Sequence, residues 1–159
     1  MAADNTTGLE NRISAESIAK LSIKETKIKT KSYNYCTPSI ILENEILYIK
    51  GRSLPENSIG FYDPIIDQVR KSASEGKIAI IDVSLGYFNT SSSNRFLELF
   101  RAFGEGAREY YSKDSRKQPT INWNYEKDDD DMQENGEDYM NILREVYHIY
   151  IPFKFVEKE

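Results

Sequence analysis

Cysteine and histidine are almost absent from this chain, and their scarcity excludes several kinds of site. Cys36 is the only cysteine, so no internal disulfide can form and no cysteine-rich metal site can be built. His148 is the only histidine, so the chain cannot supply a two-histidine metal site, and a Ser–His–Asp triad would depend on this one residue. Nothing near His148 suggests a base and its orienting partner, so we interpret it as a residue joining a helix to a strand.

Long apolar runs are also missing. No stretch approaches the roughly 20 apolar residues that span a bilayer, and residues 1–5 do not show the basic-then-apolar pattern of a secretory signal. We therefore expect a cytoplasmic protein with no membrane partner.

The sequence has no concentration of basic residues, but its acidic residues are concentrated in one segment. Residues 126–138 hold eight acidic residues and one lysine, and the rest of the chain holds 18 acidic and 20 basic residues. The chain therefore has no basic stripe to neutralise phosphates, and the aromatic segment around Trp123 adjoins the most acidic one. We expect no nucleic-acid partner.

Motifs for cofactor binding and nucleophilic catalysis are absent too. The sequence has no glycine-rich phosphate loop, no Gly-x-Ser-x-Gly elbow, and no general base at a recognisable spacing from its serines. We expect no catalytic residues, no cofactor and no enzymatic activity.

What is present is enough apolar sequence for one domain. The chain has 159 residues, of which 39% are hydrophobic. Residues 1–36 carry few large apolar groups and are expected to form an N-terminal extension, with a short helix at residues 14–21 and a charged arm or edge strand at residues 24–31. We expect the folded domain to cover residues 37–159.

The apolar patterns predict elements in the order ββαβαβαβ. This order is typical of an α/β fold, with a central mixed sheet and helices packed on it. Asp63 and Pro64 suit the start of the first helix, Gly76 suits its end, and Pro152 favours an edge position for the last strand. The expected strands are residues 39–42, 46–49, 77–83, 120–125 and 149–156, and the expected helices are residues 64–75, 96–111 and 136–147.

Helical spacing also predicts which side chains face the sheet. In the second helix these are Phe96, Leu99, Phe100, Phe103, Ala107 and Tyr110. In the third helix they are Tyr139, Leu143 and Val146, with Ile142 beside them.

A run of hydroxyl side chains, residues 90–93, separates the expected central strand from the second helix. A helix N-terminus has backbone N–H groups without intrahelical partners and partial positive charge, so it favours a side-chain oxygen or a phosphate. Two interpretations stay open: one of Ser91, Ser92 and Ser93 is an N-cap, or the run contains a phosphorylation site.

An acidic cluster, Asp128, Asp129, Asp130 and Asp131, precedes the third helix. It is interpretable as a solvated loop leading into a helix, as a docking surface for a basic partner, or as a divalent-cation site. Adjacent aspartates lack the alternate spacing and the glycine turn of a calcium loop, so we expect no metal site.

Three segments together carry a family resemblance. Residues 51–58, residues 87–93, and residues 123–125 followed by 128–132 and 136–139 occur in an order that resembles the SiaC family of bacterial regulatory phosphoproteins, over residues 37–155. The resemblance implies a fold like the STAS domains of anti-sigma-factor antagonists.

The resemblance also implies a function. Thr90 would be phosphorylated, Asn89, Ser91, Ser92 and Ser93 would form the switch loop around it, and partners would bind at Arg52, Pro55, Glu56, Asn57 and the acidic cluster. The implied partners are a SiaB-type protein kinase, a metal-dependent serine/threonine phosphatase and, for the unmodified form, a diguanylate cyclase whose cyclic-di-GMP output controls biofilm formation. The alternative is a STAS-like domain that binds a small ligand or serves as a structural interaction module, without a phosphoswitch.

Overall fold

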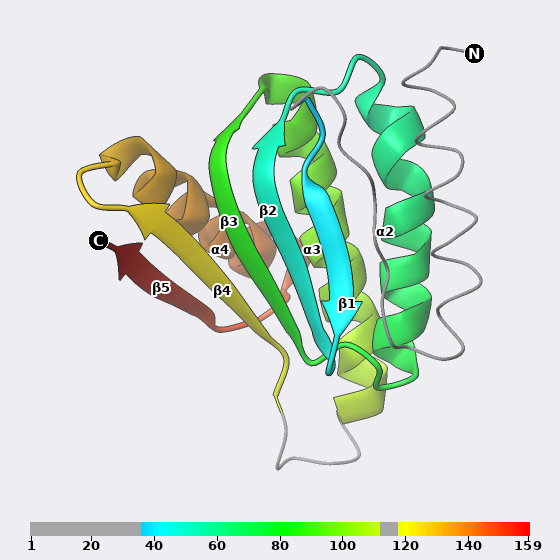
Figure 1. The fold of residues 1–159 in the computed structure, drawn as a ribbon. Coiled ribbons are helices and arrows are strands. Elements are labelled where there is room, and N and C mark those ends of the chain that lie inside the picture. Colours follow the sequence, from blue (N-terminus) through cyan, green and yellow to red (C-terminus); the bar gives the residue numbers. More distant parts are fainter. Residues whose placement is uncertain (1–35, 112–117) are drawn as a thin grey trace.

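Five strands form one mixed sheet in the order β1-β2-β3-β4-β5 (Figure 1). The protein is described here by a computed structural model, which covers residues 36–111 and 118–159. β1 and β2 pair antiparallel as the expected hairpin, and the later strands all pair in parallel. The α/β class and the element order are thus confirmed. The strands are β1 (Ser39–Glu43), β2 (Ile46–Ser53), β3 (Ile80–Phe88), β4 (Thr120–Glu126) and β5 (Phe153–Lys158).

Three helices connect the successive parallel strands and lie on one side of the sheet, behind it in Figure 1. They are α2 (Ser58–Ser74), α3 (Thr90–Tyr111) and α4 (Asp130–Tyr147). Parallel strands joined in sequence order by right-handed crossovers place their helices on the same face, which explains the two-layer arrangement. No helix in the described ranges is both long and apolar enough to cross a membrane.

The core fills the space between the sheet and the helices. Alternate strand residues such as Leu47, Ile49, Ile81, Val83 and Ile121 are almost fully buried on this face. Aromatic rings occupy the centre, where Phe100 of α3 contacts the rings of the four residues Phe96, Trp123, Tyr139 and Phe153. The expected aromatic stripe is therefore core.

Three residues predicted on or beside the inner faces of α3 and α4 are exposed. In α3, Tyr111 is buried and Tyr110 is 41% exposed, because Tyr111 follows Ala107 by four residues and so continues the buried stripe. In α4, Ile142 is 37% and Val146 61% exposed, since the helix faces the sheet through Gly136, Tyr139 and Leu143.

Every helix starts earlier than the sequence patterns predicted. α2 begins at Ser58 with Asn57 as its N-cap, whose Oδ1 accepts from the Gly60 N–H at 2.9 Å. Asp63 and Pro64 therefore lie inside the helix. α3 begins at Thr90 and α4 at Asp130, six residues before the positions expected for each. Asparagine and aspartate are strong N-caps, and each helix is capped by an asparagine or aspartate within four residues of the end of the preceding strand.

Two strands, in contrast, begin later than predicted. β3 begins at Ile80 and extends to Phe88, so Tyr87 and Phe88 belong to the sheet and not to a turn. β5 begins only at Phe153, although Ile149 and Ile151 before it are buried as expected. β5 is an edge strand, as Pro152 indicated.

The helix-to-strand junction at His148 is confirmed. His148 is the C-cap of α4 with a left-handed φ of 56°, and the Ile149 N–H donates to the Leu143 carbonyl at 2.9 Å. The expected N-terminal extension, including the expected helix at residues 14–21 and the arm at residues 24–31, lies outside the described residues except for Cys36.

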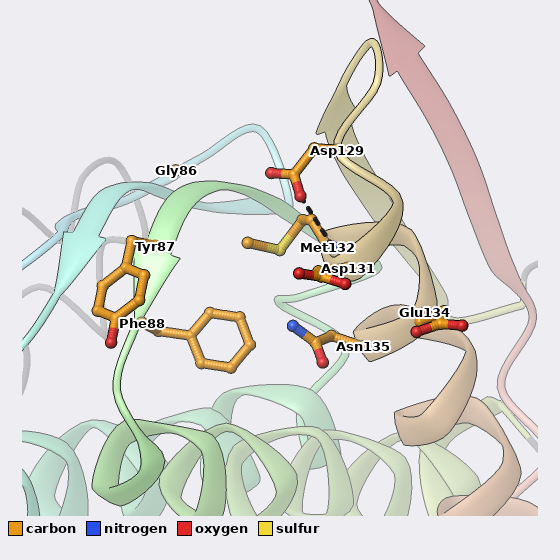
Figure 2. Close-up of a pocket in the computed structure, with 8 residues that line it drawn as sticks. All are labelled: Gly86, Tyr87, Phe88, Asp129, Asp131, Met132, Glu134 and Asn135. Atoms are coloured by element: carbon orange, nitrogen blue, oxygen red, sulfur yellow. Dashed lines mark hydrogen bonds between the residues drawn. The ribbon is translucent and has the colours of Figure 1, made fainter.

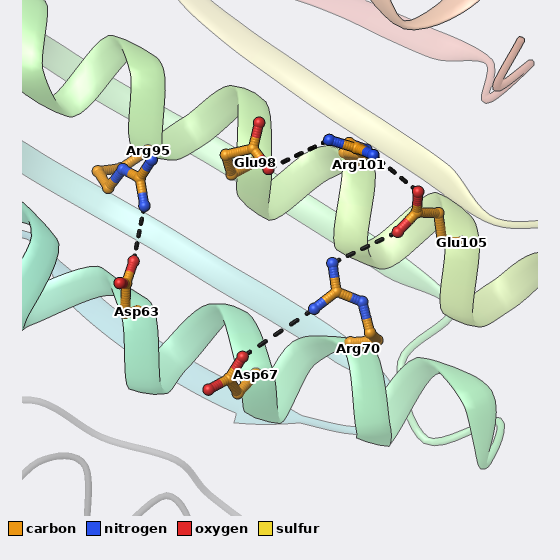
Figure 3. A network of polar contacts seen from close by, with 7 residues as sticks. All are labelled: Asp63, Asp67, Arg70, Arg95, Glu98, Arg101 and Glu105. Carbon is orange, nitrogen blue, oxygen red and sulfur yellow. Dashed lines mark hydrogen bonds and ion pairs between the residues drawn. The ribbon is translucent and has the colours of Figure 1, made fainter. Parts of the chain in front are cut away.

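α2 and α3 pack closely along their length, and ion pairs cross between them on the outer surface (Figure 3). Asp63 accepts from Arg95 at 2.6 Å, and Arg70 reaches Glu105 at 3.4 Å. Exposed ion pairs contribute about 1 kcal/mol or less each, so the close packing of the two helices stabilises this layer more than the pairs do.

Candidate functional site

The parallel strands β2, β3 and β4 end at one edge of the sheet, and this edge gathers the three segments that carry the family resemblance (Figure 1). Residues after β2, after β3 and after β4 are far apart in sequence, yet they follow neighbouring strands. A direct hydrogen bond joins the first two segments, because the Asn89 N–H donates to the Ser53 carbonyl at 3.1 Å. Such carboxyl ends of parallel strands are where α/β proteins commonly bind ligands and partners.

Asn89, and not a serine, caps α3. Its Oδ1 accepts from the Ser92 N–H at 3.0 Å and from the Ser91 hydroxyl at 3.2 Å. The interpretation in which one of the three serines is the N-cap was therefore wrong. The hydroxyl run forms the first helical turn because β3 reaches Phe88 and leaves Asn89 at the cap position.

Ser92 belongs to a buried chain of hydroxyls that ties α3 to β2 and α2. The Ser53 Oγ donates to the Ser92 Oγ at 2.8 Å, and the Ser92 hydroxyl donates to the Ser53 carbonyl at 3.0 Å. Because the Ser53 hydroxyl has a single hydrogen, Tyr62 is the donor in its 2.5 Å bond to Ser53. All three side chains are fully buried, and burial raises the pKa of Tyr62 well above its ordinary value.

Ser93 is held by a second tyrosine. The Tyr139 hydroxyl donates to the Ser93 carbonyl at 2.9 Å, and the Ser93 Oγ lies 3.0 Å from the same hydroxyl. Burial raises the pKa of Tyr139 too, so this hydroxyl remains a protonated donor at physiological pH. This pair links the first turn of α3 to α4.

Thr90 differs from its three neighbours. Its side chain is exposed, and within the described part of the chain its hydroxyl makes no hydrogen bond. Ser91 is also exposed but donates to Asn89, whereas Ser92 is buried and Ser93 is partly buried. Of the four hydroxyls, that of Thr90 is therefore the one that is both exposed and not hydrogen-bonded to another described residue.

We predict that Tyr62→Phe lowers the free energy of unfolding by about 1 to 3 kcal/mol, because it removes the donor to a fully buried Ser53 hydroxyl. Urea denaturation followed by far-UV circular dichroism measures this change. Tyr125→Phe is the matched control, since Tyr125 is a partly buried tyrosine of β4 and none of the side-chain hydrogen bonds described uses its hydroxyl. Equal effects of the two variants would contradict the role given to the buried hydroxyl chain.

The four residues at the end of β2 and before α2 that were expected to bind partners are not equally exposed. Arg52, Glu56 and Asn57 are exposed, whereas Pro55 is buried. The Arg52 guanidinium lies 5.9 Å from the centre of the Tyr87 ring, which brings this segment next to the end of β3. Asn57 combines its exposure with the capping of α2.

The acidic cluster occupies the turn and the start of α4. Asp128 has a left-handed φ of 72°, and the Asp129 Oδ1 accepts from the Met132 N–H at 3.1 Å as the N-cap. Asp130 and Asp131 stand in the first turn, where carboxylates interact favourably with the helix dipole. No cluster that could hold a metal ion is present among the described residues.

A cavity of about 400 Å³ opens between the end of β3 and the first turns of α4 (Figure 2). Its walls carry three carboxylates, a carboxamide, two aromatic residues and a methionine, and no basic residue. The lining residues are Gly86, Tyr87, Phe88, Asp129, Asp131, Met132, Glu134 and Asn135.

A β-bulge shapes the strand side of this cavity. Gly51 pairs with Leu85 and Arg52 pairs with Tyr87, so Gly86 has no partner on β2 and the alternation of β3 changes phase. Phe88 consequently packs its ring against Phe96, 5.5 Å away between centroids, while Tyr87 is 49% exposed. The sequence analysis missed this cavity. Gly86 next to an apolar run was the available signal, because glycine in a strand often marks a bulge.

Comparisons with known proteins agree with this arrangement. The family model described as SiaC family regulatory phosphoprotein matches residues 28–157. SiaC of Pseudomonas aeruginosa is 20% identical, with a TM-score of 0.63 over 84% of this chain and 99% of that chain. The apo-SiaC crystal structure from the same organism is 21% identical, with a TM-score of 0.61 over 82% and 98%.

A chain from the crystal structure of the diguanylate cyclase SiaD in complex with its activator SiaC, also from Pseudomonas aeruginosa, is 22% identical. Its TM-score is 0.60 over 79% of this chain and 96% of that chain. No curated protein matches the sequence. At these identities the structural matches show the fold.

Proposed function

Because the chain belongs to the SiaC family of regulatory phosphoproteins, we propose that Thr90 is its phosphorylation site and that phosphate at Thr90 controls binding of an effector protein. The observation that carries this proposal is the free, exposed hydroxyl of Thr90 at the start of α3, among three serines whose hydroxyls are already bonded. A kinase must reach its acceptor hydroxyl, and Thr90 satisfies this condition best.

Phosphate at this position has a predictable physical effect. It adds a charge of about −1.5 to −2 and three acceptor oxygens beside the unpaired N–H groups of the first turn of α3. The folded domain tolerates this charge, since a helix N-terminus stabilises anions. A partner packed over a neutral threonine would instead bury an unpaired dianion, at a cost of several kcal/mol. Phosphorylation would thus dissociate the complex.

We infer that the effector is a diguanylate cyclase, which the unmodified chain activates. The support is the likeness to the SiaC activator, which is found in complex with the cyclase SiaD in Pseudomonas aeruginosa. A SiaB-type kinase would add the phosphate and a metal-dependent serine/threonine phosphatase would remove it. The chain itself would act without catalysis, and in the cytoplasm, where the kinase obtains ATP.

The partner surface proposed here is the edge formed by the ends of β2, β3 and β4. Arg52, Glu56 and Asn57 are exposed on one side of Thr90, and the acidic cluster lies on the other. A protein that spans this edge would cover Thr90, which is why a phosphate there would affect its binding.

We predict that phosphorylation of Thr90 weakens effector binding roughly 100-fold or more. Thr90→Ala should bind within about threefold of the unmodified chain and accept no phosphate at this site, while Thr90→Glu should weaken binding only about tenfold, because one carboxylate imitates part of a phosphate. Mass-spectrometric phosphosite mapping after incubation with the cognate kinase, followed by calorimetry with the purified cyclase, measures both effects.

Ser91→Ala is the matched control, because it removes the other exposed hydroxyl of the same turn. It should leave both phosphorylation and binding unchanged. Phosphate on a serine of the run would show that Thr90 is the wrong residue. Equal binding of both forms would overturn the switch and favour the alternative of a ligand-binding or structural STAS-like domain.

A further inference from the structure

We propose that the cavity between β3 and α4 receives an arginine side chain of the partner protein. This inference rests on the proposed function in one respect, namely that a protein binds at this edge of the sheet. The cavity adjoins the start of α3 through Phe88, which stands two residues before Thr90. An arginine seated in it would therefore place the partner's main chain close to the start of α3.

The charges of the cavity favour a cationic occupant. Asp129, Asp131 and Glu134 line it, and none of them forms an ion pair with any basic side chain of the described residues. Asp129 uses one oxygen to cap α4, at 3.1 Å from the Met132 N–H. Three carboxylates at one cavity give it a negative potential, which attracts a cation from outside.

The apolar part of the lining identifies the cation as organic. In Figure 2, the Phe88 ring, the Met132 side chain and the Asn135 amide face the same space, with Asp131 beside them. A hard metal ion prefers oxygen ligands, whereas rings and thioethers contact the flat faces of a guanidinium favourably. The carboxylates then accept hydrogen bonds from its edge.

The exposed face of β3 shows that the chain already uses this chemistry. Arg52 places its guanidinium 5.9 Å from the centre of the Tyr87 ring. Tyr87 directly precedes Phe88 in β3. Arginine is favoured over lysine because a planar guanidinium stacks on a ring and donates to carboxylates at once, while an ammonium group is a compact, strongly hydrated charge.

The cavity and the phosphorylation site contribute separately to partner binding. Thr90 does not line the cavity, so a phosphate there leaves the carboxylates in place.

The test uses N-acetyl-arginine methylamide as the probe, titrated into the full chain and followed by amide chemical shifts in ¹⁵N–¹H NMR. We expect saturable shifts at Gly86, Tyr87 and Asn135, and binding about fivefold tighter than that of the uncharged citrulline analogue. Added salt should weaken the arginine analogue more than the citrulline analogue.

The double variant Asp131→Asn/Glu134→Gln should weaken the arginine probe about threefold to tenfold. Glu137→Gln is the matched control, because Glu137 is an exposed carboxylate of the same helix that does not line the cavity and lies outside the acidic cluster. It should leave binding of the arginine probe unchanged. Thermal unfolding of each variant verifies that the fold is intact.

Three results would overturn the proposal: no shifts at the cavity, equal binding of the arginine and citrulline analogues, or equal binding of the arginine probe and N-acetyl-lysine methylamide titrated in the same way. None of these measurements involves the kinase or the cyclase. A negative result with the arginine probe would therefore not contradict phosphorylation control at Thr90. A negative result for phosphorylation control would likewise not contradict arginine binding in the cavity.

Discussion

Truncation of Trp123 to alanine is expected to lower the free energy of unfolding by about 3 to 5 kcal/mol. Trp123 is fully buried in β4 and contacts the rings of Phe88, Phe100 and Tyr139 at centroid distances of 5.6 to 6.4 Å. Removing its ring leaves a cavity that the surrounding rings can fill only in part, since both the sheet and α4 hold them in place.

Trp123→Phe separates packing from hydrogen bonding. The indole N–H donates to the Met132 carbonyl at 2.8 Å and so fixes the first turn of α4 to the sheet. Phenylalanine retains most of the ring contacts and loses this bond, so we expect a smaller loss of about 1 to 3 kcal/mol. Urea denaturation with a far-UV signal measures both variants, and a loss below about 2 kcal/mol for alanine would contradict the central place given to Trp123.

Gly106→Ala is expected to lower the free energy of unfolding by about 1 to 3 kcal/mol, although the same change in a free helix would raise it by about 1 kcal/mol. A Cβ at Gly106 would lie 2.5 Å from the Arg70 carbonyl oxygen and 3.0 Å from the Ala73 Cβ. The first atom belongs to the backbone of α2 and the second is bonded directly to it. Neither can move without the helix, so α2 and α3 would have to separate.

Gly104→Ala is the matched control, because it makes the same substitution two residues earlier in α3. Its Cβ would meet only the side chains of Ile149 and Ile151, the nearest atom being 2.5 Å away. Side chains rotate more easily than a helix backbone moves, so this variant should be less destabilised. Equal thermal midpoints for the two variants would show that the contact between α2 and α3 is not what requires Gly106.

Most of the sheet could be predicted because strand patterns are local. Alternation over residues 120–125 identified β4 within one residue, and two short aliphatic runs around residues 43–45 identified the antiparallel hairpin. Side chains of a strand point alternately to opposite faces, so the apolar positions state directly which face is buried.

Helix starts were less predictable because several neighbouring residues can cap a helix. Near α2 the candidates included Asn57 and Asp63, and near α3 they included Asn89 and three serines. The residue used depends on where the preceding strand ends and on tertiary hydrogen bonds, such as that from Asn89 to Ser53. The presence of a capping residue in the sequence shows neither where the preceding strand ends nor which tertiary hydrogen bonds form.

By itself, the sequence determined the α/β order, the family, the hydroxyl run at the start of α3 and the acidic start of α4. These features depend on residues close together in the chain. Only the tertiary structure decided that Thr90 is the free hydroxyl of its run, because Ser92 and Ser93 bond to partners 39 and 46 residues away. It also decided that the Gly86 bulge faces α4 across a cavity, since that cavity needs two elements about 40 residues apart to be packed side by side.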